Sequence, residues 1–428
     1  MQAAYDLSAN LFTHAPRRTR EAVTWLRRAA GRGHAGAQIA LGLLHGESYG
    51  KDCGVRHDVR QAARWYRKAA EQGSADAQLN LGWAYARGEG VRKNRGEANR
   101  LYRRAAAQGD EIAMFNLGRA YRFGLGVQRN PRRSFEWFRR AAELGDLAAP
   151  RSLGDLARDH GLPLDSRTEV RWIRRAAGRG DASSQVDLGV RLSEGDGVRR
   201  NRAEALRWYG RAARQNDVHA LHNLGLAYRR GDGVPQSWPR ALAYFRRAAR
   251  QGHAGSFYKL VEYYEDGEGA PRDRRGASQW LRMAKSAARR GQAGACCFLG
   301  GYYDEDGAGK ELDMRRAVRW LRLGAALDDG DCLMMLGVHL HEGDGVPRNH
   351  ARAAELYRRG AERGSDRAAY LLGLCYHDGE GVRRDRRLAR KWFERAARRG
   401  DEDAQELLAN RNGVFEVRRG QEDETRAG

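Results

Sequence analysis

Cysteine and histidine are the residue types in this chain best able to bind a metal ion or act as nucleophiles, so their spacing is considered first. The five cysteines are Cys53, Cys296, Cys297, Cys332 and Cys375. None forms a C-x-x-C pair, and a structural zinc site needs four convergent ligands at suitable spacing. Five unevenly placed cysteines in a long chain also do not make a disulfide framework. We therefore interpret them as packed, reduced thiols.

Two pairs of histidines lie close together in the sequence. His219 and His222 are three residues apart on one expected helix, and His339 and His341 are two apart near an expected helix end. Two imidazoles alone bind a metal ion weakly, and no acidic or thiol ligand completes either pair. We interpret them as surface or internally hydrogen-bonded histidines, and we expect no metal site and no cofactor.

Glycine-rich and acidic motifs do not indicate catalysis either. Tripeptides such as 195–197 and 231–233 read Gly-x-Gly, but a dinucleotide-binding loop needs a third glycine and a preceding strand. Their recurrence after the same helix indicates a left-handed turn. Asp304, Asp306 and Gly307 do not have the spacing of a calcium loop. Since no Ser-His-Asp set, nucleophile elbow or kinase signature is present, we expect no catalytic residues and no enzyme.

A repeat of about 36 residues explains most of the abundant residue types. One large apolar residue recurs at gaps of 40, 36, 36, 35, 36, 36, 36, 40, 36 and 36 residues. Its positions are Trp25, Trp65, Leu101, Trp137, Trp172, Trp208, Tyr244, Trp280, Trp320, Leu356 and Trp392. Such a period indicates one supersecondary unit that buries its apolar face against its neighbours.

The second unit shows how each repeat is built. Apolar residues at helical spacing within 62–70, followed by Gly73, predict a first helix, which we call helix A. The pattern within 77–85 predicts a second helix, helix B, which ends at the turn 88–91. The Trp65 position should supply the large buried side chain of each unit.

Small residues should lie where two helices approach each other closely. Gly82 occupies such a position in helix B of the second unit. In the seventh unit Val261 takes its place, so we expect the helices to be farther apart there.

These residues resemble a known family. Residues 62–91, AARWYRKAAEQGSADAQLNLGWAYARGEGV, are similar to a Sel1-like repeat, and residues 207–234 repeat the pattern. The resemblance covers residues 20–410 as ten repeats and a partial eleventh. It implies an all-α fold, an α-solenoid of helix-turn-helix repeats of about 36 residues stacked into a right-handed superhelix. Tetratricopeptide repeats are the nearest alternative, but they have a shorter period.

Several segments depart from the repeat. Residues 1–19 are expected to form an N-terminal cap or extension, and residues 411–428 a disordered tail. The linker 45–58 has about four extra residues, and the eighth unit has three extra around 282–286, which should lie at turns or lengthen a helix. The fourth unit lacks its glycine pair within 155–167, where Pro163 predicts a local irregularity.

The chain is strongly basic and its basic residues are patterned. Lys and Arg number 78 against 55 Asp and Glu, giving a net charge of +23, and only seven of the 78 are lysine. Outward positions of helix A, one before and two and three after the Trp65-type residue, are repeatedly basic. We call these residues the arginine ridge. Its members are Arg64, Arg67, Lys68, Arg100, Arg103, Arg104, Arg139, Arg140, Arg171, Arg174, Arg175, Arg207, Arg211, Arg246 and Arg247.

Three interpretations of the arginine ridge remain open. A GC-rich genome encodes arginine wherever a surface needs solubility, and acidic side chains of neighbouring helices, such as Glu97 or Glu204, would pair with it. Alternatively, guanidinium groups bind carboxylates and phosphates through two parallel hydrogen bonds. By analogy with tetratricopeptide repeats, helix A would line the concave groove and present the ridge to a ligand.

The family resemblance implies a non-catalytic scaffold or adaptor for protein–protein interactions, and the ridge favours an acidic partner protein. The alternative is sequence-independent binding of a polyanion, with nucleic acid the less favoured partner. No stretch approaches the length of about 18 apolar residues that a transmembrane helix needs. No secretory signal is recognised in the first residues. We therefore expect a cytoplasmic protein without a transmembrane segment.

Overall fold

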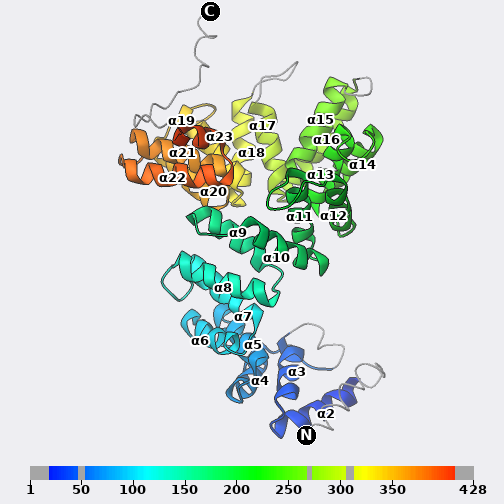
Figure 1. Ribbon diagram of the computed structural model, residues 1–428, viewed down its shortest axis with the longest axis vertical. Coiled ribbons are helices and arrows are strands. Elements are labelled where there is room, and N and C mark those ends of the chain that lie inside the picture. The colour runs from blue at the N-terminus through cyan, green and yellow to red at the C-terminus, as the bar shows by residue number, and fades with distance from the viewer. Residues whose placement is uncertain (1–18, 47–53, 268–271, 305–312, 410–428) are drawn as a thin grey trace, which may run out of the picture. The chain divides into compact units, whose positions relative to one another are not determined.

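The computed structural model describes residues 19–46, 54–267, 272–304 and 313–409. Within these residues every regular element is a helix, and no strand is present. The helices alternate between helix A and helix B along the chain and stack side by side (Figure 1). This confirms the predicted α-solenoid of helix-turn-helix repeats.

The A helices begin near each closing turn and carry the Trp65-type residue. They are α2 (Thr19–Gly31), α4 (Val59–Glu71), α6 (Arg95–Ala106), α8 (Pro131–Leu144), α10 (Ser166–Gly178), α12 (Arg202–Arg214), α14 (Trp238–Arg250), α16 (Arg274–Arg289), α18 (Met314–Ala326), α20 (His350–Glu362) and α22 (Arg386–Arg399).

The B helices follow after a short turn. They are α3 (Ala35–Gly46), α5 (Ala75–Arg87), α7 (Glu111–Phe123), α9 (Ala149–His160), α11 (Ala182–Glu194), α13 (Val218–Arg230), α15 (Ala254–Asp266), α17 (Ala293–Asp304), α19 (Gly330–Glu342), α21 (Asp366–Asp378) and α23 (Glu402–Ala409).

The chain divides into two compact units. The first contains residues 1–157 with 171–176, and the second contains 158–170 with 177–428. The division falls at α9 and α10, which belong to the fourth and fifth repeats.

The cap of each A helix also links it to the preceding repeat. Asn94 precedes α6, and its side-chain oxygen accepts a hydrogen bond from the Glu97 amide at 3.0 Å. The Asn94 amide donates to the Tyr85 carbonyl of α5 at 2.9 Å. Asn201 repeats this bond to Leu192 at 2.7 Å. One capping residue therefore starts helix A and fixes it to the previous helix B.

The turns after the B helices are left-handed, as predicted. Gly88 and Gly90 have φ angles of 85° and 71°. A Cβ atom on Gly90 would lie 1.9 Å from the carbonyl oxygen of Val59, at the start of helix A in the same repeat. This glycine is therefore required both by its φ angle and by the close approach of the backbone.

The glycine inside helix B allows the next repeat to pack closely. A Cβ atom on Gly82 would lie 2.5 Å from the Tyr102 ring of α6, and one on Gly225 would lie 2.4 Å from the Phe245 ring of α14. Such distances do not occur between real atoms, so the ring occupies the space that a side chain would fill. The predicted close approach is confirmed, and it joins helix B to the next helix A.

The prediction that the Trp65 position supplies the main buried ring was wrong in most repeats, although Trp280 in the eighth repeat is buried, at 6% exposed. Trp65 is only partly buried, whereas the following residue, Tyr66, is 8% exposed. The equivalent rings of Phe138 and Phe245 are 0% and 1% exposed. The residue after the tryptophan fills the space above the helix B glycine, and the tryptophan lies at the edge of the core beneath basic side chains.

The seventh and eighth repeats show the two predicted departures. Val261 is buried in the glycine position, and α15 contacts α16 less extensively than α13 contacts α14. The extra residues near 282–286 lengthen α16 to 16 residues, where α14 has 13. The prediction of a longer helix is therefore confirmed.

The predicted irregularity in the fourth repeat is also confirmed. Helix α9 ends at His160, Gly161 has a φ angle of 60°, and residues 162–165 are not helical. A buried ion pair follows, with Arg191 Nη2 2.6 Å from Glu169 Oε2. The extra residues of the first linker, the N-terminal extension and the C-terminal tail lie wholly or largely outside the described residues.

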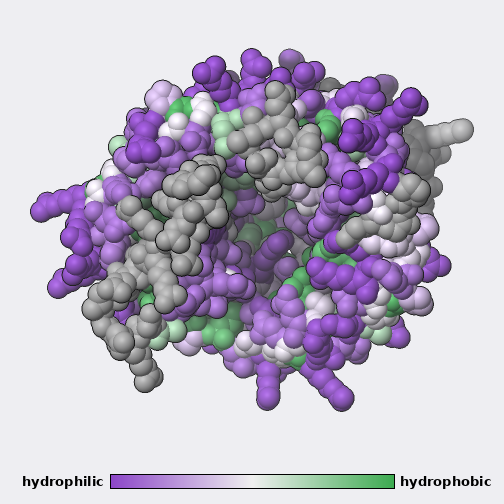
Figure 2. Space-filling view, turned by 90° about the horizontal axis from the view of Figure 1, so that it is seen from above, coloured by the Kyte–Doolittle hydropathy of each residue, from purple (hydrophilic) through white to green (hydrophobic). Residues whose placement is uncertain are grey.

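The face seen in Figure 2 is mainly hydrophilic where it is coloured, with small hydrophobic areas between polar side chains. No helix in the described part of the chain has the length and apolar character needed to cross a membrane.

The glycine–aromatic contact can be tested by Gly225→Ala. The added methyl group must displace the Phe245 ring, so we expect the free energy of unfolding to fall by about 1–3 kcal/mol. The matched control is Gly210→Ala in α12, where an added Cβ meets no atom within 4 Å. This control should gain up to about 1 kcal/mol from helix propensity. Equal effects of the two substitutions in chemical denaturation would contradict the packing argument.

Candidate interaction surface

The arginine ridge lies on the solvent side of the A helices, as predicted. All of its members are exposed except Arg246, which is partly buried. In the first unit they lie on α4, α6, α8 and the 171–176 segment of α10, and in the second unit on α12 and α14.

Three of the five ridge arginines that lie two residues after the Trp65-type position are held by tyrosines. Each donates from Nη2 to a tyrosine hydroxyl on helix B of the same repeat, which orients the guanidinium group. The pairs and distances are Arg67–Tyr85 at 3.1 Å, Arg103–Tyr121 at 3.4 Å and Arg246–Tyr264 at 2.7 Å. The hydrogen bond from Arg103 lowers the pKa of Tyr121 below its usual value.

Three of the arginines that lie three residues after that position bind the preceding repeat. Each donates to a carbonyl in the last turn of the previous helix A, where the helix dipole favours a positive charge. The donor–acceptor pairs are Arg104–Ala70 at 3.3 Å, Arg175–Glu143 at 3.2 Å and Arg247–Ala213 at 3.1 Å. These members of the ridge therefore stabilise repeat stacking.

Other basic members cover the tryptophan rings. Lys68 Nζ lies 4.7 Å from the ring centre of Trp65, and the Arg211 guanidinium lies 4.4 Å from that of Trp208. These cation–π contacts explain why a tryptophan at the edge of the core is followed by a basic residue.

Acidic pairing of the ridge is local. Glu97 pairs with Arg100 at 3.1 Å, but the two residues lie on the same helix rather than on neighbouring helices. Glu204 accepts a hydrogen bond from Trp208 Nε1 at 3.3 Å. Glu97 therefore pairs with a ridge arginine of its own helix, whereas the prediction placed this pairing between neighbouring helices.

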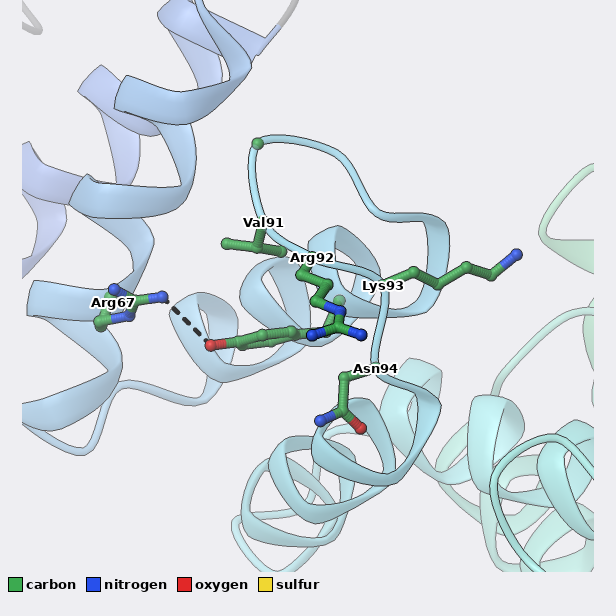
Figure 3. Close-up of a pocket in the computed structure, with 7 residues that line it drawn as sticks. Arg67, Val91, Arg92, Lys93 and Asn94 are labelled. Carbon is green, nitrogen blue, oxygen red and sulfur yellow. Dashed lines mark hydrogen bonds between the residues drawn. The ribbon is translucent and has the colours of Figure 1, made fainter.

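An open pocket of about 620 Å³ lies beside Arg67 (Figure 3). Arg67, Tyr85, Arg92 and residues 90–94 of the closing turn line it. The dashed line in Figure 3 marks the bond from Arg67 to the Tyr85 hydroxyl, and Lys93 extends away from it. The pocket thus combines a fixed guanidinium with a second one, from Arg92, on the turn.

A second pocket of about 250 Å³ lies between α5, α6 and α7. Its lining includes Trp83, Arg87, Arg119 and Asn116. Trp83 is 37% exposed, and Asn116 Nδ2 is buried without a hydrogen-bond acceptor among the described residues. The pocket therefore offers an aromatic surface, two cations and an unused amide donor.

The sequence pair His219 and His222 is part of a larger cluster. Both rings contact His253 from the next repeat, at centroid distances of 5.4 and 4.4 Å. Ser256 Oγ lies 2.9 Å from His222 Nδ1. Burial, together with the neighbouring imidazoles, lowers the pKa of His222 to about 3 and that of His253 to about 4. His222 and His253 are therefore neutral at pH 7 and internally packed, as expected, whereas His219 is exposed.

Two of the cysteines meet across repeats. Cys297, Cys332 and Asp329 place one ligating atom each within 4.8 Å of one another, and Cys297 Sγ lies 4.0 Å from Met335 Sδ. Cys332 is fully buried, and its pKa is raised by the Cys297 thiol and by burial, which keeps its thiol protonated. All the cysteines in the described residues are reduced.

The second sequence pair of histidines separates. His339 is 3% exposed with Nε2 3.6 Å from an Asp304 carboxylate oxygen, so it is not a surface residue. His341 is partly buried and lies close to His350 and Glu380. Sequence reasoning missed this group and the cysteine group because it compared neighbours along one helix. Both contain residues about one repeat apart, which is the spacing that the solenoid brings together.

Comparison with known families gives a direct match. The Sel1 repeat pattern matches residues 3–34, 35–74, 75–110, 112–146, 182–217, 218–253, 258–288, 293–329, 330–365 and 366–401. The unmatched segment 147–181 contains α9 and α10, the irregular part of the array. No curated protein matches the chain.

Two solved structures of repeat proteins are similar to this chain, with sequence identities of 32% and 31%. The chain is 32% identical to c5321, described as a protective antigen of uropathogenic Escherichia coli with an SLR fold, with a TM-score of 0.60. That match covers 92% of this chain and 84% of c5321. A Sel1 repeat protein from Oxalobacter formigenes is 31% identical over 57% of this chain and 96% of its own, with a TM-score of 0.48.

The buried histidine cluster makes stability depend on pH. Because the folded pKa values of His222 and His253 lie below the unfolded value of about 6.5, the unfolded chain binds more protons between pH 6.5 and 4. The free energy of unfolding should therefore fall as the pH falls through this range. His253→Asn keeps the helix cap and should flatten this fall while leaving stability at pH 8 nearly unchanged. The free energies of unfolding of the parent protein and of His253→Asn should be measured by denaturant titration at several pH values. The same dependence on pH in both proteins would refute this prediction.

Proposed function

The chain belongs to the Sel1 repeat family, and from that premise we propose that it is a non-catalytic scaffold or adaptor whose arginine ridge binds an acidic protein partner. Sel1 repeats generally serve protein interactions. The finer proposal, concerning the ridge and the acidity of the partner, is supported by the arrangement of the guanidinium groups.

The observation that carries the proposal is the ordered guanidinium groups in successive repeats. Arg67 and Arg103 occupy equivalent positions 36 residues apart, and each is oriented by a tyrosine on the adjacent helix. A side chain already held in place loses less entropy when it binds a ligand. An extended segment with carboxylates at matching spacing would meet one oriented guanidinium in each of these two repeats, and each can form charge-assisted hydrogen bonds.

The pocket between α5, α6 and α7 is lined by a side of α6 that faces away from Arg103 and Arg104, so it offers a separate site for a side chain of the partner. Exposed aromatic and arginine side chains dominate the binding energy of many protein interfaces, and Trp83, Arg87 and Arg119 surround this recess. The buried Asn116 amide gains a partner when a carbonyl or carboxylate enters it. We therefore assign the partner's anchor residue an apolar side chain followed by an acidic one.

Nucleic acid is the less favoured partner. Proteins that bind single strands stack bases on exposed aromatic rings. The tryptophans beside the ridge are already covered by basic side chains of the same repeat, as Lys68 covers Trp65. We propose a cytoplasmic location because the described cysteines are reduced thiols.

The proposal is tested by reversing charge on the ridge in the first unit. Arg64→Glu combined with Arg139→Glu alters two exposed side chains of α4 and α8. Partners captured by the parent protein from native lysate at physiological salt, and identified by mass spectrometry, should be enriched in acidic segments. The double variant should bind a purified partner at least about tenfold more weakly, because each lost charged hydrogen bond contributes about 1.5–3 kcal/mol. Its thermal unfolding should remain nearly unchanged.

The matched control carries the same change in net charge elsewhere. Arg129→Glu combined with Arg199→Glu alters two exposed arginines in closing turns, and it should retain binding. Equal weakening by both double variants, with affinity for nucleic acid that falls steeply with salt, would instead identify a non-specific polyanion binder. Recovery of only chaperones would reject the scaffold proposal.

A further inference from the structure

His341, His350 and Glu380 form a compact cluster in the second unit. They come from the end of α19, the first turn of α20 and the closing turn after α21. His341 Nδ1 lies 3.3 Å from His350 Nδ1, and His341 Nε2 lies 3.1 Å from Glu380 Oε2. One ligating atom from each residue lies within 4.8 Å of the others, and all three side chains are partly exposed.

The spacing matches the coordination of a transition metal. Metal–nitrogen bonds of about 2.0–2.1 Å place neighbouring ligands of a tetrahedron about 3.3 Å apart. The two Nδ1 atoms already have this separation. The Glu380 carboxylate contacts the opposite nitrogen of His341 and so orients the imidazole, an arrangement common around metal-bound histidines.

The equivalent position in another repeat holds a cation. Arg202 is the first residue of α12 and pairs at 3.1 Å with Asp232, which follows the first glycine of the closing turn. His350 and Glu380 occupy the same two positions in the repeat that contains α20 and α21. The junction there retains a carboxylate and has an imidazole in place of the guanidinium.

Two carboxylates lie near this junction. Burial raises the pKa of the nearby Tyr357, and neighbouring negative charges that include Glu342 and Glu380 raise it further. Two carboxylates therefore act on this junction.

We propose that His341 and His350 bind a divalent transition metal of the Zn²⁺ or Ni²⁺ class through Nδ1, with Glu380 orienting His341 and supplying negative charge. Imidazole nitrogen selects this class over Mg²⁺ and Ca²⁺, which prefer oxygen ligands. A bound ion would tie together α19, α20 and the turn after α21. Since the unfolded chain does not hold these ligands together, binding would stabilise the folded array.

The test is calorimetric titration of the chelator-treated full chain with Ni²⁺ and with Zn²⁺. We expect one equivalent to bind saturably and to raise the thermal midpoint, with no response to Mg²⁺. His350→Asn should abolish this binding, and Glu380→Gln should weaken it by about 10–100-fold. Circular dichroism of both variants should match that of the parent.

Two controls assign the site. His377 lies one repeat beyond His341 and contacts Asp378. The substitution His377→Asn should therefore leave metal binding unchanged. Cys297→Ser removes one thiol of the cysteine group and should also leave it unchanged. Absence of saturable binding to the parent, or loss of binding in Cys297→Ser but not in His350→Asn, would overturn the proposal.

Discussion

The close approach of helix B to the helix A that follows it is the contact on which the rest of the structure depends. A glycine in helix B and an aromatic or branched residue in the next helix A fill one another's space, as Gly82 and Tyr102 do. No single hairpin contains both partners, so an isolated repeat leaves its largest ring without a packing surface. Stability therefore belongs to the junctions between repeats. The matched Sel1 patterns themselves mostly span a helix B and the next helix A.

This dependence on junctions explains much of the basic composition. The last turn of each helix A exposes carbonyl groups that need donors, and an arginine from the next repeat provides one, as Arg104 does for Ala70. The same helix A position places a cation over a tryptophan at the edge of the core. Like charges four residues apart, which cost an isolated helix stability, are therefore retained where each has a separate partner in the array. The proposed binding can then rest on Arg67 and Arg103, which are exposed and held by tyrosines.

Sequence periodicity sufficed to predict the helix pairs, the left-handed turns, the helix B glycine and the lengthened α16. It did not identify which aromatic residue is buried, because Trp65 and Tyr66 are adjacent and both fit an apolar helical stripe. Only the position of the glycine across the junction decides that Tyr66 enters the core. The candidate clusters were missed for a related reason. His222 and His253, or Cys297 and Cys332, are near neighbours only when residues about one period apart are compared.

That comparison changes how chemistry should be sought in such an array. Equivalent positions in different repeats have nearly the same backbone geometry. Comparing the side chains at these positions therefore shows the effect of a substitution at one junction. At one junction, the positive charge of Arg202 pairs with the negative charge of Asp232. Where His350 replaces that arginine, the same backbone places two imidazoles beside a carboxylate. An array can therefore acquire a ligand site without altering its fold, provided that the glycine–aromatic contacts on either side of the junction remain in place.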